Sequence, residues 1–534
     1  MPKPRRKLKR SSSVCSHNDR DVSMGAEAIQ PAVFLVPFPA QGHVTPMLHL
    51  ARALAAHGVA ATVAVPDFIH RRIAGSRARE ADVGVELASI PSGILLQEGG
   101  GRDADPPGFG AIVHAMEHHM PAHLECMLLA SCRGRVACLV VDVLASWAVP
   151  VAERCGVPAA GFWPAMLASY RAVAAIPELL GKGIISESGT PAVSSNQPDN
   201  GGQEEEQVIR GLRILPAQLE LSTKELPWLV GDSATQRSRF TFWLQTLHRA
   251  RGFRSVLVNS FPGEDGSADD DGQQPRQQGA PRVVPVGPLL LAGGNVECAK
   301  RDGGGGVAAP NNTQQQPCSK NPSMWLADST CVRWLDAQPA ASVVYVSFGS
   351  WVGPIGHGKI RELALGLEAT GRPFLWALKD DPSWRAGLPG GYAARVAGHG
   401  KLVGWAPQDD VLRHAAIGCY LTHCGWNSTV EAIQHGVRML CYPVSGDQFI
   451  NCAYITRAWE VGLKLGSMSQ DIVKDCIERI MEGAEGTRLQ EKMNALRQRV
   501  VAAEARCLAQ GNVRSFVNEI KRDHPLLMQI YNIL

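Results

Sequence analysis

The chain has 534 residues, of which 45% are hydrophobic and 19% are charged, and its formal net charge at pH 7 is +3. This length predicts two sizeable domains rather than a single core. Because so small a net charge produces no strong field, the composition argues against nucleic acid or an anionic membrane surface as a partner and favours small molecules.

The first 31 residues are expected to form a disordered basic tail, because residues 1–31 contain the cluster RRKLKR and many serines. A targeting segment, or a start further along at Met24, is the alternative. The chain has 14 cysteines but no C-x-x-C pair, and it opens without an apolar leader, so we expect reduced thiols and a cytoplasmic location. The apolar run 137–152 contains Asp142 and Pro150 and is too short to span a bilayer.

From residue 32 onward, short β-rich segments alternate with helical patterns. Residues 32–39, 46–58 and 59–66 predict a strand, a helix and a second strand. Further strands are expected in 83–90, 135–142, 157–163 and 254–260, and a long helix is expected in 112–130. Strands separated by helices predict a parallel sheet that is covered by helices on both faces.

This alternation breaks between residues 261 and 321, where Gly, Gln and Asp are abundant. We expect loops there, with an ordered crossing at 283–290 and a disordered insert at about 292–323. A second alternation of strands and helices then runs from 341 to about 521. The sequence therefore predicts an α/β protein in which two parallel sheets face each other across a cleft, at the carboxyl ends of their strands.

Several cysteine and histidine side chains near residue 420 raise the question of a metal site. The spacing of Cys419, His423, Cys424 and Cys441 lacks the paired ligands of structural zinc sites. The D-x-D triplets of the chain lie in polar or Gly-rich loops rather than after strands, so we expect no metal. The dinucleotide motif G-x-G-x-x-G does not follow any strand, and a P-loop does not occur.

The stretch THCGWNSTVE, residues 422–431, instead predicts a phosphate site. Residues 416–421 have the composition of a buried strand, Gly425 suits a tight turn, and Trp426 begins a helical pattern. A helix N-terminus offers free N–H groups and a positive dipole end to an anion. The carboxylate of Glu431 could accept hydrogen bonds from both hydroxyls of a ribose. Further donors could come from His423, Asn427 and Ser428. An ordinary helix N-cap is the alternative.

The segment from Trp405 to Gln448 resembles the signature box of plant-type UDP-dependent glycosyltransferases that act on small molecules. The similarity extends from about Ala32 to Lys521 and includes PFPAQGHVTPMLHLA at 37–51. It implies the GT-B fold, with two Rossmann-like parallel-sheet domains. The implied divisions are an acceptor-binding domain at 32–284, a UDP-sugar-binding domain at 285–505, and a C-terminal helix in 506–534 that packs back on the first domain.

The resemblance also implies a role for each matching position in the box. Trp405 would stack on uracil, and the backbone of Ala406 would meet the edge of the base. The ribose would bind Gln408 and Glu431. The diphosphate would lie at the turn of Gly425 and be held by His423, Asn427, Ser428 and Ser350. Sugar hydroxyls would be bound by Trp426, Asp447 and Gln448.

His43 follows the first strand, and the resemblance implies that it is the general base. An imidazole that titrates near neutral pH can take the proton of an acceptor hydroxyl as it attacks the anomeric carbon. Asp142 ends another strand of the same sheet, where it could fix the imidazole tautomer and stabilise the imidazolium. The implied reaction is an inverting transfer of glucose from UDP-glucose to a hydroxyl or carboxyl group of a small lipophilic acceptor, by a monomer that needs no cofactor.

A few positions depart from the family pattern. Arg438 stands where Pro is usual, VSG at 444–446 precedes the Asp-Gln pair, and Pro164 stands where many relatives carry a hydroxyl group near the sugar. A non-catalytic UDP-sugar-binding protein is the alternative function, and an oxidoreductase would rest on fold similarity alone. The presence of both His43 and Asp142 favours the enzyme.

Overall fold

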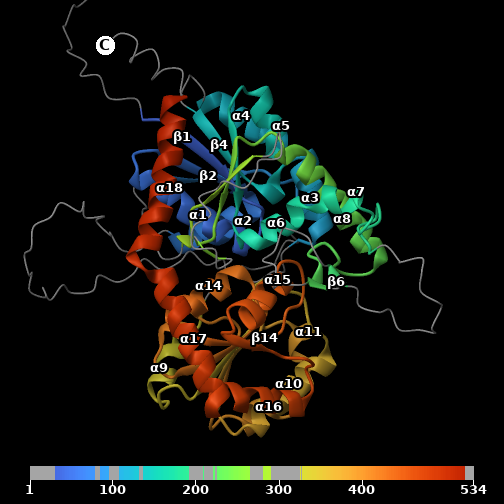
Figure 1. Ribbon diagram of the computed structural model, residues 1–534, viewed down its shortest axis with the longest axis vertical. Coiled ribbons are helices and arrows are strands. Elements are labelled where there is room, and N and C mark those ends of the chain that lie inside the picture. Colours follow the sequence, from blue (N-terminus) through green and yellow to red (C-terminus); the bar gives the residue numbers. More distant parts are fainter. Residues whose placement is uncertain are drawn as a thin grey trace, which may run out of the picture.

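The computed structural model describes residues 30–77, 84–94, 107–131, 136–191, 208–209, 221–222, 225–261, 263–264, 281–289, 325, 327–350 and 352–523. The expected basic tail up to residue 29, the expected insert at 292–323 and the end of the chain after residue 523 lie outside the described residues. The described chain forms two halves, one above the other in Figure 1.

The N-terminal half is built on a seven-stranded parallel sheet with the strand order β3-β2-β1-β4-β5-β8-β9. Its strands are β1 (Ala32–Val36), β2 (Ala60–Pro66), β3 (Val85–Ile90), β4 (Val136–Asp142), β5 (Ala159–Trp163), β8 (Ser255–Val258) and β9 (Arg282–Pro285). Its helices are α1 (Gln41–Ala56), α2 (Asp67–Arg77), α3 (Phe109–His118), α4 (Met120–Ser131), α5 (Ala148–Arg154), α6 (Leu167–Ala174), α7 (Ile176–Gly181) and α8 (Ser233–Ala250). A small antiparallel pair consists of β6 (Val208–Ile209) and β7 (Leu221–Ser222).

The C-terminal half is built on a six-stranded parallel sheet with the order β12-β11-β10-β13-β14-β15. Its strands are β10 (Val343–Ser347), β11 (Phe374–Ala377), β12 (Gly400–Val403), β13 (Ile417–Thr422), β14 (Arg438–Cys441) and β15 (Gly462–Lys464). Its helices are α9 (Thr330–Asp336), α10 (His357–Ala369), α11 (Pro382–Arg385), α12 (Tyr392–Arg395), α13 (Gln408–Arg413), α14 (Trp426–His435), α15 (Gln448–Ala453), α16 (Gln470–Met481) and α17 (Gly483–Val501). The predicted α/β class with two parallel sheets is confirmed.

In each sheet the order in which the chain adds strands reverses at a central strand, and this reversal fixes where a ligand can bind. In the first sheet β1 lies between β2 and β4, and in the second β10 lies between β11 and β13. The chain winds outward in opposite directions from such a strand, which leaves a crevice at the carboxyl ends of the two neighbours. His43 follows β1 and Asp142 is the last residue of β4, whereas Ser350 and His423 follow β10 and β13.

One expected helix is divided in two. The pattern at 112–130 predicts a single helix, but α3 ends at His118 and α4 begins at Met120. Pro121 has no N–H group for the carbonyl four residues earlier, and its ring crowds that carbonyl. The helical pattern therefore continues across a break in the backbone.

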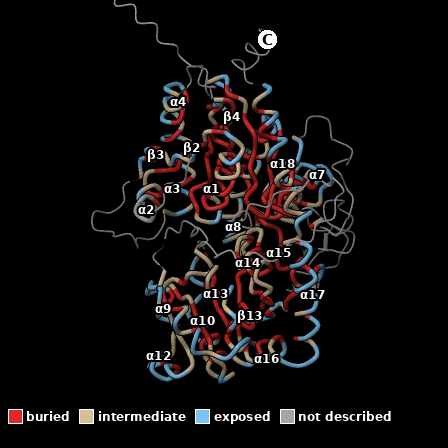
Figure 2. The backbone as a smooth tube through the Cα atoms, turned by 90° about the vertical axis from the view of Figure 1, so that its left-hand side faces the viewer, coloured by how far each residue is buried: buried red, intermediate tan, exposed pale blue. Residues whose placement is uncertain are grey.

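The last helix, α18 (Ala503–Arg522), returns from the C-terminal half to the N-terminal half, where it contacts α1, β4 and β9 (Figure 1). Its apolar side chains join the N-terminal core, which is buried in Figure 2. These side chains are Val513, Phe516, Val517 and Ile520. Two ion pairs flank them, Arg282 with Glu519 at 2.6 Å and Arg254 with Asp523 at 2.6 Å.

Nine of the described cysteines are free thiols. Cys507 in α18 is disulfide-bonded, which differs from the expectation of reduced thiols throughout. None of the helices within the described ranges is long and apolar enough to cross a membrane.

Candidate active site

His43 and Asp142 meet at the crevice of the first sheet. Asp142 Oδ2 lies 2.7 Å from His43 Nδ1, and Asp142 Oδ1 accepts a hydrogen bond of 2.9 Å from the N–H of Leu144. The Asp142 side chain is fully buried, while that of His43 is 24% exposed. The carboxylate is held by β4 and by the backbone that follows it. Because Asp142 contacts Nδ1, the other ring nitrogen of His43, Nε2, is the one that does not bond to this carboxylate.

The surroundings of His43 make it a stronger base than a free imidazole. Burial lowers the pKa of His43, but the charge and the hydrogen bond of Asp142, together with the charge of Asp447, raise it above its ordinary value. Asp447 belongs to the C-terminal half. The imidazole is therefore influenced by carboxylates from both halves of the protein.

His43 lies in the first turn of α1, which begins before the helix expected at 46–58. Pro46 lies inside the same helix. Since Pro46 has no N–H group, the carbonyl of Gly42 lacks its usual partner within the helix. That carbonyl instead accepts a hydrogen bond of 3.1 Å from Nδ2 of Asn427, in α14 of the other half. The residue beside His43 is thus tied to the predicted phosphate site.

The turn before α14 is arranged differently from the prediction. Gly425 has an ordinary extended conformation with φ −62°, and the residue in the left-handed region is Cys424 with φ 64°. A Cβ atom on Gly425 would lie 2.4 Å from Nε2 of His423, and one on Gly349 would lie 2.7 Å from the same ring. Both glycines are therefore needed to make room for His423.

His423 is placed to donate to an anion as a neutral imidazole. Its side chain is buried and its Nδ1 has no hydrogen-bond partner within the described residues. Burial, followed by the charge of Lys379, lowers the pKa of His423 to about 4. At neutral pH the ring is uncharged, and one of its nitrogens carries a proton.

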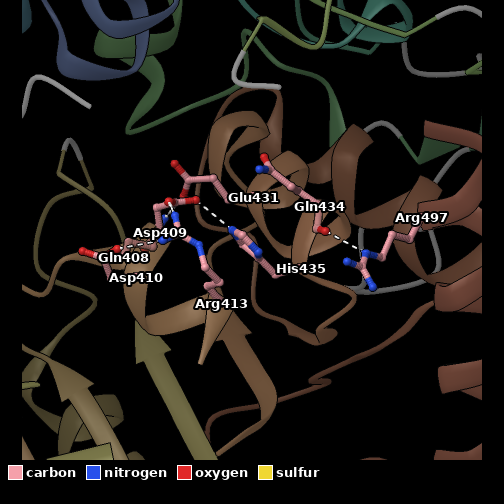
Figure 3. A network of polar contacts seen from close by, with 8 residues as sticks. All are labelled: Gln408, Asp409, Asp410, Arg413, Glu431, Gln434, His435 and Arg497. Atoms are coloured by element: carbon pink, nitrogen blue, oxygen red, sulfur yellow. Dashed lines mark hydrogen bonds and ion pairs between the residues drawn. The ribbon is translucent and has the colours of Figure 1, made fainter. Parts of the chain in front are cut away.

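The predicted ribose pair forms the upper end of a polar network (Figure 3). Nε2 of Gln408 donates to Glu431 Oε2 at 2.6 Å and to Ser428 Oγ at 2.9 Å. Oε1 of Gln408 accepts from the hydroxyls of Tyr345 and Tyr420. Every polar atom of the Gln408 side chain is thus used to orient its neighbours. The network continues through Asp409, which pairs with His435 and Arg413 (Figure 3).

The acidity of Glu431 in this network is strongly altered. Burial raises the pKa of Glu431 to about 7, although the hydrogen bond from Gln408 opposes this effect. Since Nε2 of Gln408 occupies one carboxylate oxygen, the other oxygen is left for a ligand. This arrangement is compatible with the predicted contact to a ribose hydroxyl.

Trp405, the predicted uracil platform, stacks on Trp325 with ring centroids 5.7 Å apart and planes 28° apart. The guanidinium carbon of Arg72, in α2, lies 5.4 Å from the centroid of the Trp325 ring. One face of Trp405 is therefore covered, so a base would use the opposite face or displace Trp325. The adjacent Ala406 is buried.

Asp447 and Gln448 lie at the start of α15, beyond the carboxyl end of β14. Asp447 Oδ2 accepts a hydrogen bond of 3.0 Å from Asn451, and burial raises the pKa of Asp447. Oε1 of Gln448 accepts from the N–H groups of Val444 and Ser445. Gln448 therefore presents its Nε2 donor, rather than both a donor and an acceptor, to a sugar.

The side chain of Trp426 is engaged elsewhere than predicted. Its Nε1 donates to the carbonyl of Asn259 at 2.6 Å, and its ring stacks on Phe261 at 6.2 Å. Asn259 also donates to the carbonyl of Pro164. The indole N–H is therefore not available to a sugar hydroxyl, and Trp426 joins the two halves instead.

The structure also brings Cys452, which the sequence did not single out, together with Cys424 and Cys441, which were considered as metal ligands. The Sγ atoms of Cys424, Cys441 and Cys452 lie within 4.8 Å of one another, and all three residues are buried. This cluster includes neither Cys419 nor His423, which were considered as ligands on the basis of the sequence. Hydrogen bonds from Cys424 and Cys441 lower the pKa of Cys452.

Two further residues of the site had no clear signal in the sequence. Nζ of Lys379 donates to the carbonyls of Ser350 and Val352 at 3.0 and 2.8 Å, so it fixes the loop after β10. Trp325 follows the Gly- and Gln-rich insert, where an isolated aromatic residue was the only available clue.

Two family matches cover most of the described chain. Residues 30–90 match the family "Glycosyltransferase, N-terminal domain", and residues 327–494 match "UDP-glucoronosyl and UDP-glucosyl transferase". The chain is 41% identical to UDP-glycosyltransferase 82A1 of Arabidopsis thaliana, over 92% of this chain and 99% of that protein. It is 32% identical to the DIMBOA UDP-glucosyltransferase BX8 of Zea mays, over 87% and 93%.

Solved structures share the same architecture. The structure of Os79 from O. sativa in complex with UDP has a TM-score of 0.72 and 25% identity, over 91% of this chain and all of that one. A UDP-glucosyltransferase from Polygonum tinctorium has a TM-score of 0.69 and 27% identity, over 92% and 99%.

Two parallel sheets with a histidine–aspartate pair on one side and a helix N-terminus on the other define a GT-B glycosyltransferase. The chain belongs to the plant-type UDP-glycosyltransferase family and is an enzyme of that class.

Proposed function

We propose that this enzyme transfers glucose from UDP-glucose to a hydroxyl or carboxyl group of a small lipophilic acceptor, with inversion at the anomeric carbon and with His43 as the general base. The observation that carries the proposal is the pair of His43 and Asp142, 2.7 Å apart, at the crevice that faces Asp447. A neutral imidazole with a raised pKa is suited to accept the acceptor's proton. A non-catalytic UDP-sugar-binding protein would not need this pair.

The donor would bind to the C-terminal half. Trp405 and Ala406 would hold uracil, and Gln408 would orient Glu431 toward the ribose. The diphosphate would lie against the N-terminus of α14, close to His423, Asn427, Ser428, Gly425 and Ser350. Free N–H groups and the helix dipole stabilise negative charge there. As the bond to UDP breaks, these preorganised donors would stabilise the developing charge, so we propose that transfer needs no metal ion.

The sugar would have Asp447 and Gln448 on one side and the imidazole of His43 on the other. The Asp447 carboxylate would accept hydrogen bonds from sugar hydroxyls, while Nε2 of Gln448 would donate to them, so the pair can distinguish the orientation of neighbouring hydroxyls. Direct attack by an acceptor from the His43 side would form the new bond as the bond to UDP breaks. That single displacement gives a β-glucoside from the α-linked donor.

The test is a transfer assay with UDP-glucose and a panel of small hydroxylated acceptors, with UDP release and NMR of the product as readouts. We expect a β-glucoside, unchanged turnover in EDTA, and UDP-galactose poorer by roughly tenfold to a hundredfold in kcat/KM. An α-glycoside would contradict the proposed displacement. Loss of turnover in EDTA that Mn²⁺ restores would contradict the metal-free site. Binding of UDP-glucose without any transfer would support the non-catalytic alternative.

A further inference from the structure

Arg239, in the middle of α8, is a cation without an anionic partner among the described residues. Its Nε is buried and has no hydrogen-bond partner, and among the described residues its guanidinium makes no ion pair. Its guanidinium carbon lies 5.2 Å from the centroid of the Phe109 ring. Burial lowers the pKa of Arg239, because removal from water disfavours the charged form.

The neighbouring acidic groups are already used. Both carboxylate oxygens of Glu117, in α3, accept hydrogen bonds of 2.8 Å from Arg249 of α8. Asp232 caps the start of α8 through the N–H of Thr235 at 2.8 Å. A partly buried cation is costly unless it is paired. An unpaired guanidinium beside an active site is therefore available to an anion supplied by a ligand.

Arg239 lies at the end of a row of rings that begins at the general base. The ring of His43 is 5.2 Å from that of Phe38, and Phe38 is 6.4 Å from Phe109, on whose ring Arg239 lies. Only two aromatic rings thus separate the imidazole from the guanidinium. The row is flanked by Phe242, whose ring meets Phe109 edge-on at 5.4 Å.

Such a row suits an acceptor with two different ends. The aromatic side chains would pack against an apolar body, while His43 would face the hydroxyl that attacks the sugar. A guanidinium presents N–H groups at its edges while its face lies on a ring, and these groups match the two oxygens of a carboxylate. The position of Arg239 corresponds to the far end of the acceptor.

We propose that Arg239 binds a carboxylate of the acceptor, so that the preferred substrates are aromatic hydroxy acids whose hydroxyl group lies at His43 and whose carboxylate lies at Arg239. This inference rests on the proposed function, since it describes the acceptor of the same site. The inference predicts that charged acceptors are preferred to neutral ones, whereas the proposed function makes no such distinction.

The experiment compares acceptors that differ only in charge. Each of several 4-hydroxyphenyl alkanoic acids of increasing chain length is paired with its neutral primary amide, and kcat/KM is measured with UDP-glucose. We expect the best acid to exceed its amide by roughly tenfold or more, because a hydrogen bond to a charged group is worth more than a neutral one. NMR of the product verifies that the phenolic oxygen carries the sugar.

Arg239→Leu should reduce the ratio of acid to amide to about one while the amide is still turned over, and Arg239→Lys should keep part of the preference. Arg237→Gln removes an exposed charge from the same helix and should leave the ratio unchanged. If thermal unfolding shows that Arg239→Leu does not fold, the acid-to-amide ratio of kcat/KM in Arg239→Lys is used as the test instead.

Equal rates for acid and amide in the unaltered enzyme would overturn this inference but not the proposed function. A preference that survives in both Arg239 variants would also overturn it. If neither acids nor amides nor any other hydroxylated acceptor received a sugar, the proposed function itself would fail.

Discussion

At the scale of single residues, the acidity of His43 depends on Asp142. The carboxylate stabilises the imidazolium and raises the pKa of His43, against the effect of burial. A protonated imidazole cannot accept a proton, so activity should fall as the pH drops below this pKa. The acidic limb of the pH profile therefore reports the contact between these two side chains.

Asp142→Asn should shift this acidic limb to lower pH, because the imidazolium would lose its charged partner. The plateau of kcat/KM should also fall, although less than in His43→Ala, for which we expect a loss of roughly 10² to 10⁴. UDP affinity should change by no more than a few fold in either variant, and it serves as the control for folding. An unchanged acidic limb in Asp142→Asn would show that His43 is not the group that titrates.

At the scale of elements, α1 carries a proline whose consequence appears in the other half of the protein. Pro46 leaves the Gly42 carbonyl free, and Asn427 of α14 donates to it. An alanine at position 46 would restore an N–H group that competes for this carbonyl. Residue 46 therefore influences the contact between two helices without touching the donor site.

Pro46→Ala should leave the melting temperature equal or higher, because alanine suits a helix interior better than proline. Activity should fall by roughly two- to tenfold, the equivalent of one net hydrogen bond of about 0.5–1.5 kcal/mol. Asn427→Ala provides the second arm of a double-mutant cycle with kcat as the readout. If both act through one hydrogen bond, the double variant should be no slower than Asn427→Ala alone, whereas fully additive losses would exclude this link.

Sequence and structure agree best where the signal is local. Buried parallel strands appear as apolar runs, so most strands of both sheets were predictable, whereas the edge strands β9 and β15 were not. Polar residues at or after the strand ends marked His43, Asp142 and His423. The roles assigned to Gly425 and Trp426 were not predictable in the same way. Gly425 is fixed by the space that His423 needs, and Trp426 by the carbonyl of Asn259. These contacts depend on how distant segments pack.

At the scale of the whole molecule, α18 belongs to the core of the half that it reaches last. Phe516 is 4% exposed and packs in the N-terminal core, whereas Glu519 pairs with Arg282 at the surface. Burial of apolar side chains stabilises far more than exposed ion pairs do. The contribution of α18 to stability should therefore come from its apolar face.

Phe516→Ala should lower the free energy of unfolding by about 3–5 kcal/mol, the range for a large aromatic residue removed from a core. Glu519→Gln, three residues further on, should lower it by less than about 1 kcal/mol, since its ion pair is partly exposed. Urea unfolding of both variants beside the parent protein measures the difference. Losses of equal size would mean that the ion pairs, rather than the apolar face, hold α18 in place.

The chain passes between the two halves twice, once between β9 and α9 and once at Ala502, the single extended residue between α17 and α18. Two bodies that are joined at two separate points keep one easy rotation, about the line through both points. We expect the cleft to open by rotation about this line rather than by sliding or twisting of the sheets. Each time UDP leaves and a new donor enters, the imidazole and the helix N-terminus should return to the same alignment.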